Sequence, residues 1–188
     1  VAILSLESDF KIVGEAGDGV AACEQYEKLR PNVLILDLRM PEMDGFEVVQ
    51  KLLTSDASAR ILIMTTYDTD EDIWRCLKAG AKGYLLKDAS HSEIVTAVRT
   101  VASGESFTSS ALIAKVARRA SAPELTKRER DVLNYLAVGM TNKEIAIEMG
   151  IGAGTVKTHL RTLFKKLEVS TRSEAINTAI QRGLIRLE

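Results

Sequence analysis

Cysteine is scarce in this sequence: Cys23 and Cys76 are the only two among 188 residues. Small secreted domains that depend on disulfides carry cysteine at much higher density, so this class is disfavoured. Both cysteines fall in segments with helical patterning. We therefore expect two reduced, half-buried side chains rather than a disulfide.

Long apolar runs and repeated or low-complexity segments are also absent. No run approaches the roughly 18 apolar residues that a membrane-spanning helix needs. Hydrophobic residues make up 46% of the chain and charged residues 27%, values that fit an ordinary globular protein rather than a disordered or membrane one. The first residues turn acidic too early for a signal peptide, so a cytoplasmic location is expected.

The net charge is only -1, but it is unevenly distributed. Residues 1–119 hold 14 Lys and Arg against 18 Asp and Glu, whereas residues 120–188 hold 11 against 8. A front part with net charge -4 and a back part with +3 is expected where only the back part contacts a polyanion.

The stretch from Val33 to Gly45 is the most informative in the chain. Its apolar run, residues 33–36, predicts a strand that is buried on both faces and ends at Asp37. Pro41 and Gly45 then predict a turn into a helix. Asp37 would thus stand at the carboxyl end of a strand, where open parallel sheets bind their ligands.

Two further apolar runs end in polar residues. Residues 61–64 precede Thr65, and residues 84–86 precede Lys87. Because the carboxyl ends of parallel strands share one edge of the sheet, Asp37, Thr65 and Lys87 are expected to meet. A carboxylate, a hydroxyl and an ammonium group make a site for an anion that carries phosphorus, or for a metal.

The remaining patterns of the first part alternate between strand and helix. Alternation of this kind predicts a parallel sheet with helices on both faces. The expected elements are the last turns of a helix at 1–8, a strand at 11–16, and helices at 20–29, 46–54, 69–80, 90–103 and 109–119.

The pattern changes near Pro123, after which only helices are predicted. Three of the four expected helices open with a capping box, a Ser or Thr followed three residues later by Glu. The pairs are Thr126 with Glu129, Thr141 with Glu144, and Thr171 with Glu174.

Residues 141–150 and 155–167 predict two helices joined by a short glycine-containing turn, a helix-turn-helix. The second helix carries a polar and basic face opposite its apolar stripe. Taken alone, such a face is as often a solvent-exposed surface without a partner as it is a binding surface. Cations for phosphates together with short side chains for base edges favour a helix that enters the major groove. We expect DNA contacts from Lys157, Thr158, Arg161, Lys165, Thr155 and Lys143.

These two motif sets, in this order, resemble a two-component response regulator of the NarL/FixJ type. The resemblance implies an α/β doubly wound parallel sheet, the flavodoxin-like receiver, followed by an all-α four-helix LuxR-type helix-turn-helix domain. The expected boundaries are 1–105 for the receiver, 106–123 for a linker helix and linker, and 124–188 for the DNA-binding domain.

The resemblance also implies a chemistry. Asp37 would accept a phosphoryl group from a sensor histidine kinase, and Mg²⁺ would be bound by Asp37, by the backbone carbonyl of Arg39 and by an upstream acidic pair. Lys87 and Thr65 would contact phosphoryl oxygens, and Tyr84 would turn inward as the switch aromatic. The structural alternatives are a plain ion pair for Lys87 and a half-buried strand aromatic for Tyr84.

Regulation is implied in the same way. The unphosphorylated receiver would mask the recognition helix, and phosphorylation would release it. The active form would be a homodimer on double-stranded DNA, paired through the last helix, 171–183. Its residues Ile176, Ala179 and Ile180 could equally belong to the core of the domain.

The sequence departs from this family at two places. The family begins with a strand that ends in two acidic residues, about 20 positions before Val1, and we expect that the natural protein has this segment. The turn before the recognition helix reads Gly152-Ala153-Gly154, where relatives commonly carry a serine and a charged residue. Glycine is an acceptable helix cap, but phosphate contacts from a hydroxyl there are lost.

Two other functions share parts of this pattern. A hydrolase of the haloacid-dehalogenase kind also uses an aspartate at a strand end, but it needs a second acid two residues later, where this chain has Arg39. The protein is therefore not expected to be an enzyme. The other alternative is a DNA-binding regulator that acts without phosphorylation and uses its receiver for dimerisation. Retention of Asp37, Thr65 and Lys87 together argues against it.

Overall fold

The computed structural model describes residues 4–67 and 69–185. Its contacts divide the chain into two compact units. The first comprises Val1–Asp68 and Asp72–Ala117, and the second comprises Thr69–Glu71 and Arg118–Glu188. Among the described helices, none is long and apolar enough to cross a membrane.

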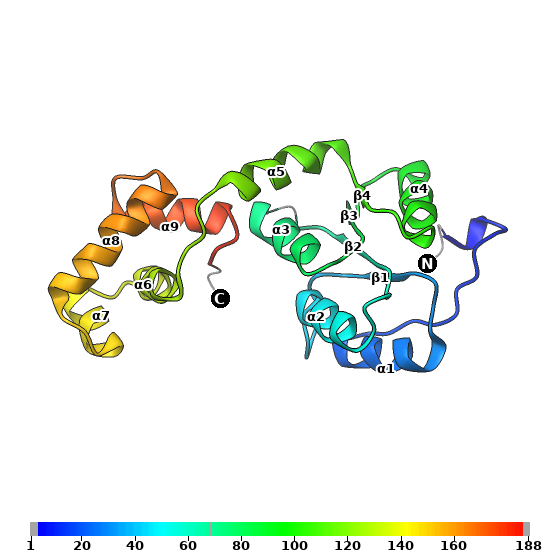
Figure 1. Ribbon diagram of the computed structural model, residues 1–188, viewed down its shortest axis with the longest axis horizontal. Helices are drawn as coiled ribbons and strands as arrows, with labels where there is room; N and C mark the ends of the chain where they lie inside the picture. The colour runs from blue at the N-terminus through cyan, green and yellow to red at the C-terminus, as the bar shows by residue number, and fades with distance from the viewer. Residues whose placement is uncertain (1–3, 68, 186–188) are drawn as a thin grey trace. The chain divides into compact units, whose positions relative to one another are not determined.

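The first unit contains a parallel sheet (Figure 1). In the described residues its strand order is β1-β2-β3-β4, which matches the order along the chain. The strands are β1 (Leu34–Leu36), β2 (Ile61–Thr65), β3 (Gly83–Leu86) and β4 (Phe107–Thr108). The predicted parallel sheet is confirmed, whereas β4 was not predicted, because two residues are too few to show a periodic pattern.

Helices cover both faces of this sheet. They are α1 (Gly19–Leu29), α2 (Gly45–Ser55), α3 (Asp70–Lys78) and α4 (His91–Ala102), followed by α5 (Ser110–Ser121). Alternate residues of a strand point to opposite faces, so Ile61 and Ile63 pack in the cluster with α1, α2 and α3, while Leu62 packs in the cluster with α4. Both cysteines are fully buried, and burial raises the pKa of the Cys76 thiol to about 12.

Side-chain caps define where several helices begin. The Asp18 side chain accepts a hydrogen bond from the Ala21 amide and opens α1. Asp44 and Glu47 form a complete capping box at the start of α2, which was not predicted. Ser90 caps α4, because its side chain accepts a hydrogen bond from the amide of Glu93.

The predicted strand at 11–16 is wrong. Residues 11–16 form neither helix nor strand, and Ile12 and Val13 are exposed. A strand requires a neighbour that satisfies its backbone hydrogen bonds, and within the described sheet β1 to β4 pair only with one another. The helix end predicted at 1–8 is only a single 3₁₀ turn at Leu4–Leu6, and its first three positions lie outside the described residues.

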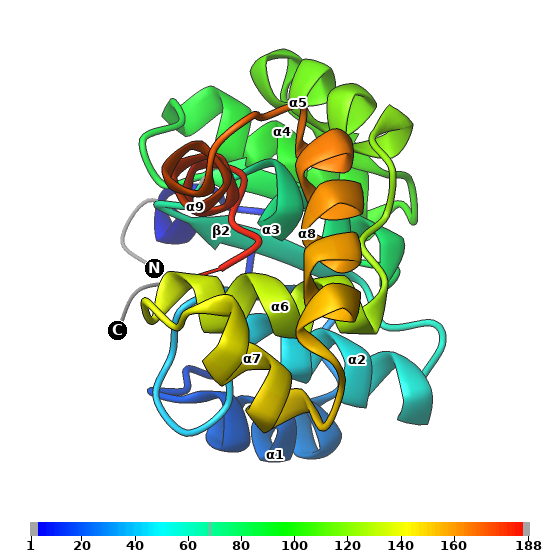
Figure 2. The same cartoon turned by 90° about the vertical axis from the view of Figure 1, so that its left-hand side faces the viewer.

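The second unit is helical. In the described residues it contains α6 (Lys127–Ala137), α7 (Asn142–Met149), α8 (Ala153–Leu167) and α9 (Arg172–Gln181), which Figure 2 shows gathered together. All three predicted capping boxes are present. One apolar cluster joins the four helices, with Val132, Ile145, Val156 and Leu163 fully buried.

An ion pair between the partly buried Lys166 and the buried Glu129 connects α8 to the start of α6. Lys166 Nζ lies 2.7 Å from Glu129 Oε2 and 2.9 Å from the carbonyl oxygen of Glu124. Burial raises the pKa of the Glu129 carboxyl, but the hydrogen bonds from Lys166 and Thr126 lower it by more, so its pKa lies below the usual value. This pair helps to set the orientation of α8 against α6.

Two isoleucines of α7 provide a matched test of this packing. Ile145 is fully buried, whereas Ile147 is 78% exposed. We expect Ile145→Ala to lower the free energy of unfolding by about 3 kcal/mol, because it opens a cavity in the core. Ile147→Ala should stay within about 0.5 kcal/mol of the parent. Urea unfolding followed by circular dichroism measures both, and equal losses would contradict the observed packing.

The Glu129 pair predicts a dependence on pH. Because folding lowers the pKa of Glu129, its stabilisation is complete above the ordinary value of about 4.3 and is lost as the pH falls through the lowered value. Glu129→Gln should remove this part of the acid sensitivity and cost about 2 kcal/mol of unfolding free energy at neutral pH. Urea unfolding at several pH values tests this, with the exposed Glu148→Gln as the control.

Candidate functional site

Asp37 lies directly after β1, and the structure brings it together with two residues from neighbouring strand ends. Lys87 Nζ lies 2.5 Å from Asp37 Oδ2. Thr65, the last residue of β2, is fully buried, and its hydroxyl is one of the groups that lower the pKa of the Asp37 carboxyl. The pairing of β2 with β3 brings this about, since Thr65 stands opposite Leu86 and Lys87 is the next residue along. A carboxylate, a hydroxyl and an ammonium group therefore share one small site.

The Asp37 carboxyl is ionised at neutral pH. Burial raises its pKa, but the hydrogen bonds from Lys87, from the Arg39 amide and from Thr65 lower it by more, so the pKa lies below its usual range. The Asp37 side chain is 29% exposed and the Lys87 side chain 43%. The carboxylate is thus charged, oriented by donors and open to an incoming ligand.

Gly45 allows the chain to turn closely behind Asp37. A Cβ atom at this position would lie 2.3 Å from the Asp37 carbonyl oxygen, far inside contact distance. The Gly45 amide donates to the Leu38 carbonyl oxygen at 2.9 Å. The Asp-Gly pair of the sequence therefore begins α2 and also fixes the backbone that carries Asp37.

Tyr84, in β3, is fully buried and turned inward. Its hydroxyl donates to the carbonyl oxygen of Tyr67 at 2.7 Å. The Tyr67 amide in turn donates to the Thr65 hydroxyl at 3.4 Å. Tyr84 is thus more deeply buried than the alternative, a half-buried strand aromatic, implies. The two hydrogen bonds connect Tyr84 through Tyr67 to Thr65.

Arg39 contributes a contact that the sequence did not indicate. Its Nη2 atom lies 3.0 Å from Asp72 Oδ2, in the first turn of α3. The same guanidinium lies over the Tyr67 ring, 4.6 Å from its centre. Asp72 is 33 positions away in the sequence, and no spacing rule connects the two residues.

The Asp37 carboxylate suits one common mode of Mg²⁺ binding. No group of three or more His, Cys, Asp or Glu side chains that could hold a metal occurs in the described part of the chain. Mg²⁺ is often bound by only one or two carboxylates together with substrate phosphate oxygens and water. The Asp37 carboxylate, which is ionised and partly exposed, is an oxygen ligand of this kind.

The residues predicted to contact DNA lie mainly on α8. Lys157, Thr158, Arg161 and Lys165 are exposed along this helix, opposite its buried apolar face. Thr155, in the first turns of α8, and Lys143, on α7, are exposed as well. The face is thus accessible and carries positive charge.

The start of α8 differs from its prediction. The helix begins at Ala153 rather than Thr155, with Gly152 as the N-cap and no side-chain hydrogen bond at the cap. The predicted start at Thr155 is two residues too late, because the glycine-rich residues after Ile151 favour a turn in the sequence although Ala153 and Gly154 are helical. Gly154 lies within the first helical turn, and its carbonyl oxygen accepts from the Thr158 hydroxyl at 3.2 Å.

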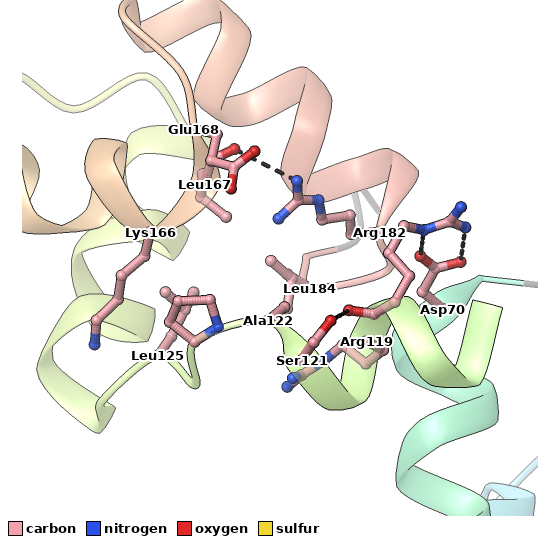
Figure 3. Close-up of a pocket in the computed structure, with 12 residues that line it drawn as sticks. Asp70, Arg119, Ser121, Ala122, Leu125, Lys166, Leu167, Glu168, Arg182 and Leu184 are labelled. Atoms are coloured by element: carbon pink, nitrogen blue, oxygen red, sulfur yellow. Dashed lines mark hydrogen bonds and ion pairs between the residues drawn. The ribbon is translucent and has the colours of Figure 1, made fainter. Parts of the chain in front are cut away.

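A pocket of about 230 Å³ lies at the opposite end of α8 (Figure 3). Leu125, Lys166, Leu167 and Leu184 are among the residues that line it. Small-molecule sites usually have volumes of about 300–1,000 Å³. We therefore assign no ligand to this pocket.

Of the three residues predicted for dimerisation, one belongs to the interior of the domain. Ala179 is fully buried in the core of the second unit, so its side chain cannot form an intermolecular surface in this conformation. Ile176 and Ile180 are only partly buried, at the edge of the same cluster.

Comparison with known proteins connects both units to one architecture. The model of the response regulator receiver domain matches residues 1–99, and that of the bacterial regulatory proteins of the luxR family matches residues 123–179. A probable transcriptional regulatory protein NarL of Mycobacterium tuberculosis is 39% identical, over 98% of this chain and 88% of its own length.

Two further proteins are similar to this chain over most of its length. The nitrate/nitrite response regulator protein NarL of Escherichia coli is 38% identical, over 92% of this chain and 84% of its own length. The crystal structure of the response regulator ChrA, from a heme-sensing two-component system, matches with a TM-score of 0.55 and 35% identity, over 98% of this chain and 90% of the other. The chain therefore belongs to the transcriptional response regulators that join a receiver domain to a LuxR-type DNA-binding domain.

Proposed function

We propose that Asp37 is the phosphoacceptor that switches this regulator. The observation that carries the proposal is the ionised Asp37 carboxylate, held 2.5 Å from the Lys87 ammonium at the carboxyl ends of the strands. Phosphoryl transfer depends mainly on an in-line nucleophile and on neutralisation of the charge on the transferring oxygens. Asp37 supplies the nucleophile, and Lys87 supplies the positive charge.

In this reaction an Asp37 oxygen attacks the phosphorus atom of the donor. The bond from phosphorus to the donor's leaving atom breaks, and that atom departs with the electron pair. An acyl phosphate on Asp37 remains. Mg²⁺, held by the Asp37 carboxylate and the Arg39 carbonyl, would neutralise charge on the transferring group.

Thr65 and Tyr84 would carry the effect of the phosphoryl group into the fold. The Thr65 hydroxyl, which lowers the pKa of the Asp37 carboxyl, would donate to a phosphoryl oxygen. Tyr84 is linked to Thr65 through Tyr67, so a shift of Thr65 would change the support of the Tyr84 side chain. A local change of charge would thereby alter the surface near β3 and α3.

DNA binding is assigned to the exposed face of α8. Receiver domains take phosphoryl groups from histidine kinases and LuxR-type domains bind DNA, and we propose a sensor histidine kinase and double-stranded DNA as the partners. Cationic side chains neutralise phosphates, and the hydroxyls of Thr155 and Thr158 are short enough to approach base edges. The proposed phosphate contacts are Lys157, Arg161, Lys165 and Lys143.

For the whole chain we propose a receiver at 1–105, a linker helix and linker at 106–123, and a DNA-binding domain at 124–188. The active form would be a cytoplasmic homodimer, and the partly buried Ile176 and Ile180 would extend to its interface. A symmetric dimer would read two half-sites spaced by one or more helical turns of DNA.

The phosphoacceptor is tested by mass spectrometry. Incubation with acetyl phosphate and Mg²⁺ should add one phosphoryl group to the parent protein and none to Asp37→Asn, which lacks the anionic nucleophile. Asp88→Asn, a change of a nearby exposed carboxylate, should be phosphorylated like the parent. Undiminished phosphorylation of Asp37→Asn would show that the acceptor lies elsewhere.

The DNA interface is tested by titration of labelled duplex DNA at several salt concentrations. Arg161→Ala should weaken binding by about 10- to 100-fold and flatten the salt dependence, because one charge that displaces counterions is removed. Arg128→Ala removes the same charge from the exposed start of α6 and serves as the matched control. If both variants lose affinity equally, α8 does not have the special role assigned to it.

A further inference from the structure

The guanidinium of Arg39 connects the Asp37 loop to helix α3. It pairs with Asp72 at 3.0 Å and lies over the Tyr67 ring at 4.6 Å. The Asp72 side chain is only 4% exposed, and that of Arg39 is 24% exposed. We name these three residues, Arg39, Tyr67 and Asp72, the Arg39 clasp.

Each end of the Arg39 clasp is bonded to the acceptor site. The Arg39 amide donates to Asp37 Oδ1 at 3.3 Å. The Tyr67 amide donates to the Thr65 hydroxyl, and the Tyr67 carbonyl accepts from Tyr84. A change in the position of the Arg39 side chain would therefore affect both α3 and the loop that supports Thr65.

Charge distinguishes the role of Arg39 from that of Lys87. Lys87 already contacts the Asp37 carboxylate, so it interacts with the acceptor before and after transfer. The Arg39 guanidinium is instead paired with Asp72. Additional negative charge on Asp37 would offer this guanidinium a second partner that competes with Asp72. An interaction can shift an equilibrium between two states only if it differs between them.

A phosphoryl group would be an effective competitor. It carries a charge of about -1.5 to -2 and three acceptor oxygens, and the planar guanidinium binds such groups through two parallel hydrogen bonds. It would be attached two residues from Arg39. Asp72 lies in the first turn of α3, where the helix dipole favours a carboxylate, so its charge would remain partly compensated after Arg39 leaves.

We propose that Arg39 is a positioning residue that exchanges Asp72 for the phosphoryl group on Asp37. This inference rests on the proposed function of Asp37. In the unmodified protein the Arg39 clasp holds the first turn of α3 against the acceptor loop. After transfer, the guanidinium turns to the phosphoryl oxygens, stabilises the acyl phosphate and releases Asp72, so that α3 is less firmly held.

The exchange predicts opposite effects for two variants. Asp72→Asn removes the competing charge and should raise the steady phosphorylated fraction, relative to the unphosphorylated one, by about fivefold, a ratio that corresponds to about 1 kcal/mol. Arg39→Gln removes the stabilising charge and should lower that ratio by a similar factor. In the double variant, Asp72→Asn should have no further effect. A purely structural pair would make both single variants change in the same direction.

The measurement is the intact mass of the whole chain at fixed acetyl phosphate and Mg²⁺. Arg75→Gln is the matched control, because it changes another α3 arginine, whose guanidinium lies over the Phe46 ring at 4.0 Å, and it should leave the ratio unchanged. Hydrogen exchange of α3 provides a second readout. Phosphorylation should increase exchange in the first turn of α3 in the parent, whereas Asp72→Asn should show raised exchange even without phosphorylation.

The outcomes separate this inference from the proposed function. If the parent gains no phosphoryl group, the function proposed for Asp37 is overturned, and the exchange with it. If the parent is phosphorylated but both variants shift the ratio in the same direction, or α3 exchange does not respond, only the exchange by Arg39 is overturned.

Discussion

The ion pair between Asp37 and Lys87 is the interaction on which the receiver half depends. Two residues 50 positions apart meet because the strands that precede them are parallel and are held in register by β2, which lies between them. The apolar side chains of β2, such as Ile61 and Ile63, are fully buried and fix that register. Packing of the core therefore determines which side chains reach the site, since a register slip of one residue would turn Thr65 to the other face of the sheet.

In the helical second unit, packing of the core likewise determines which side chains are exposed. The apolar stripe of α8 is buried, and Lys166 is drawn inward to Glu129, so that the other cations of α8 remain on the exposed side. Capping boxes define the first residues of α6, α7 and α9. The N-cap of α8 is Gly152, which has no side chain to form such a hydrogen bond. The ion pair near its carboxyl end therefore helps to orient α8, the helix proposed to bind DNA. The backbone amides at its amino-terminal end have no side-chain cap.

Local signals allowed much of this to be predicted from sequence. Apolar runs that end in a polar residue indicated Asp37, Thr65 and Lys87, and capping pairs located the helices. Features that depend on distant partners were missed. The segment 11–16 has the composition of a strand but pairs with no described strand, and the contact of Arg39 with Asp72 depends on how two remote side chains approach across the fold.

The central claim is that charge placed on Asp37 controls DNA binding by α8. It is tested most directly by the DNA affinity of one preparation before and after phosphorylation with acetyl phosphate and Mg²⁺, at one fixed salt concentration. The account predicts tighter binding after phosphorylation for the parent protein and no change for Asp37→Asn. Equal affinity of the parent before and after a phosphoryl gain verified by mass would contradict it.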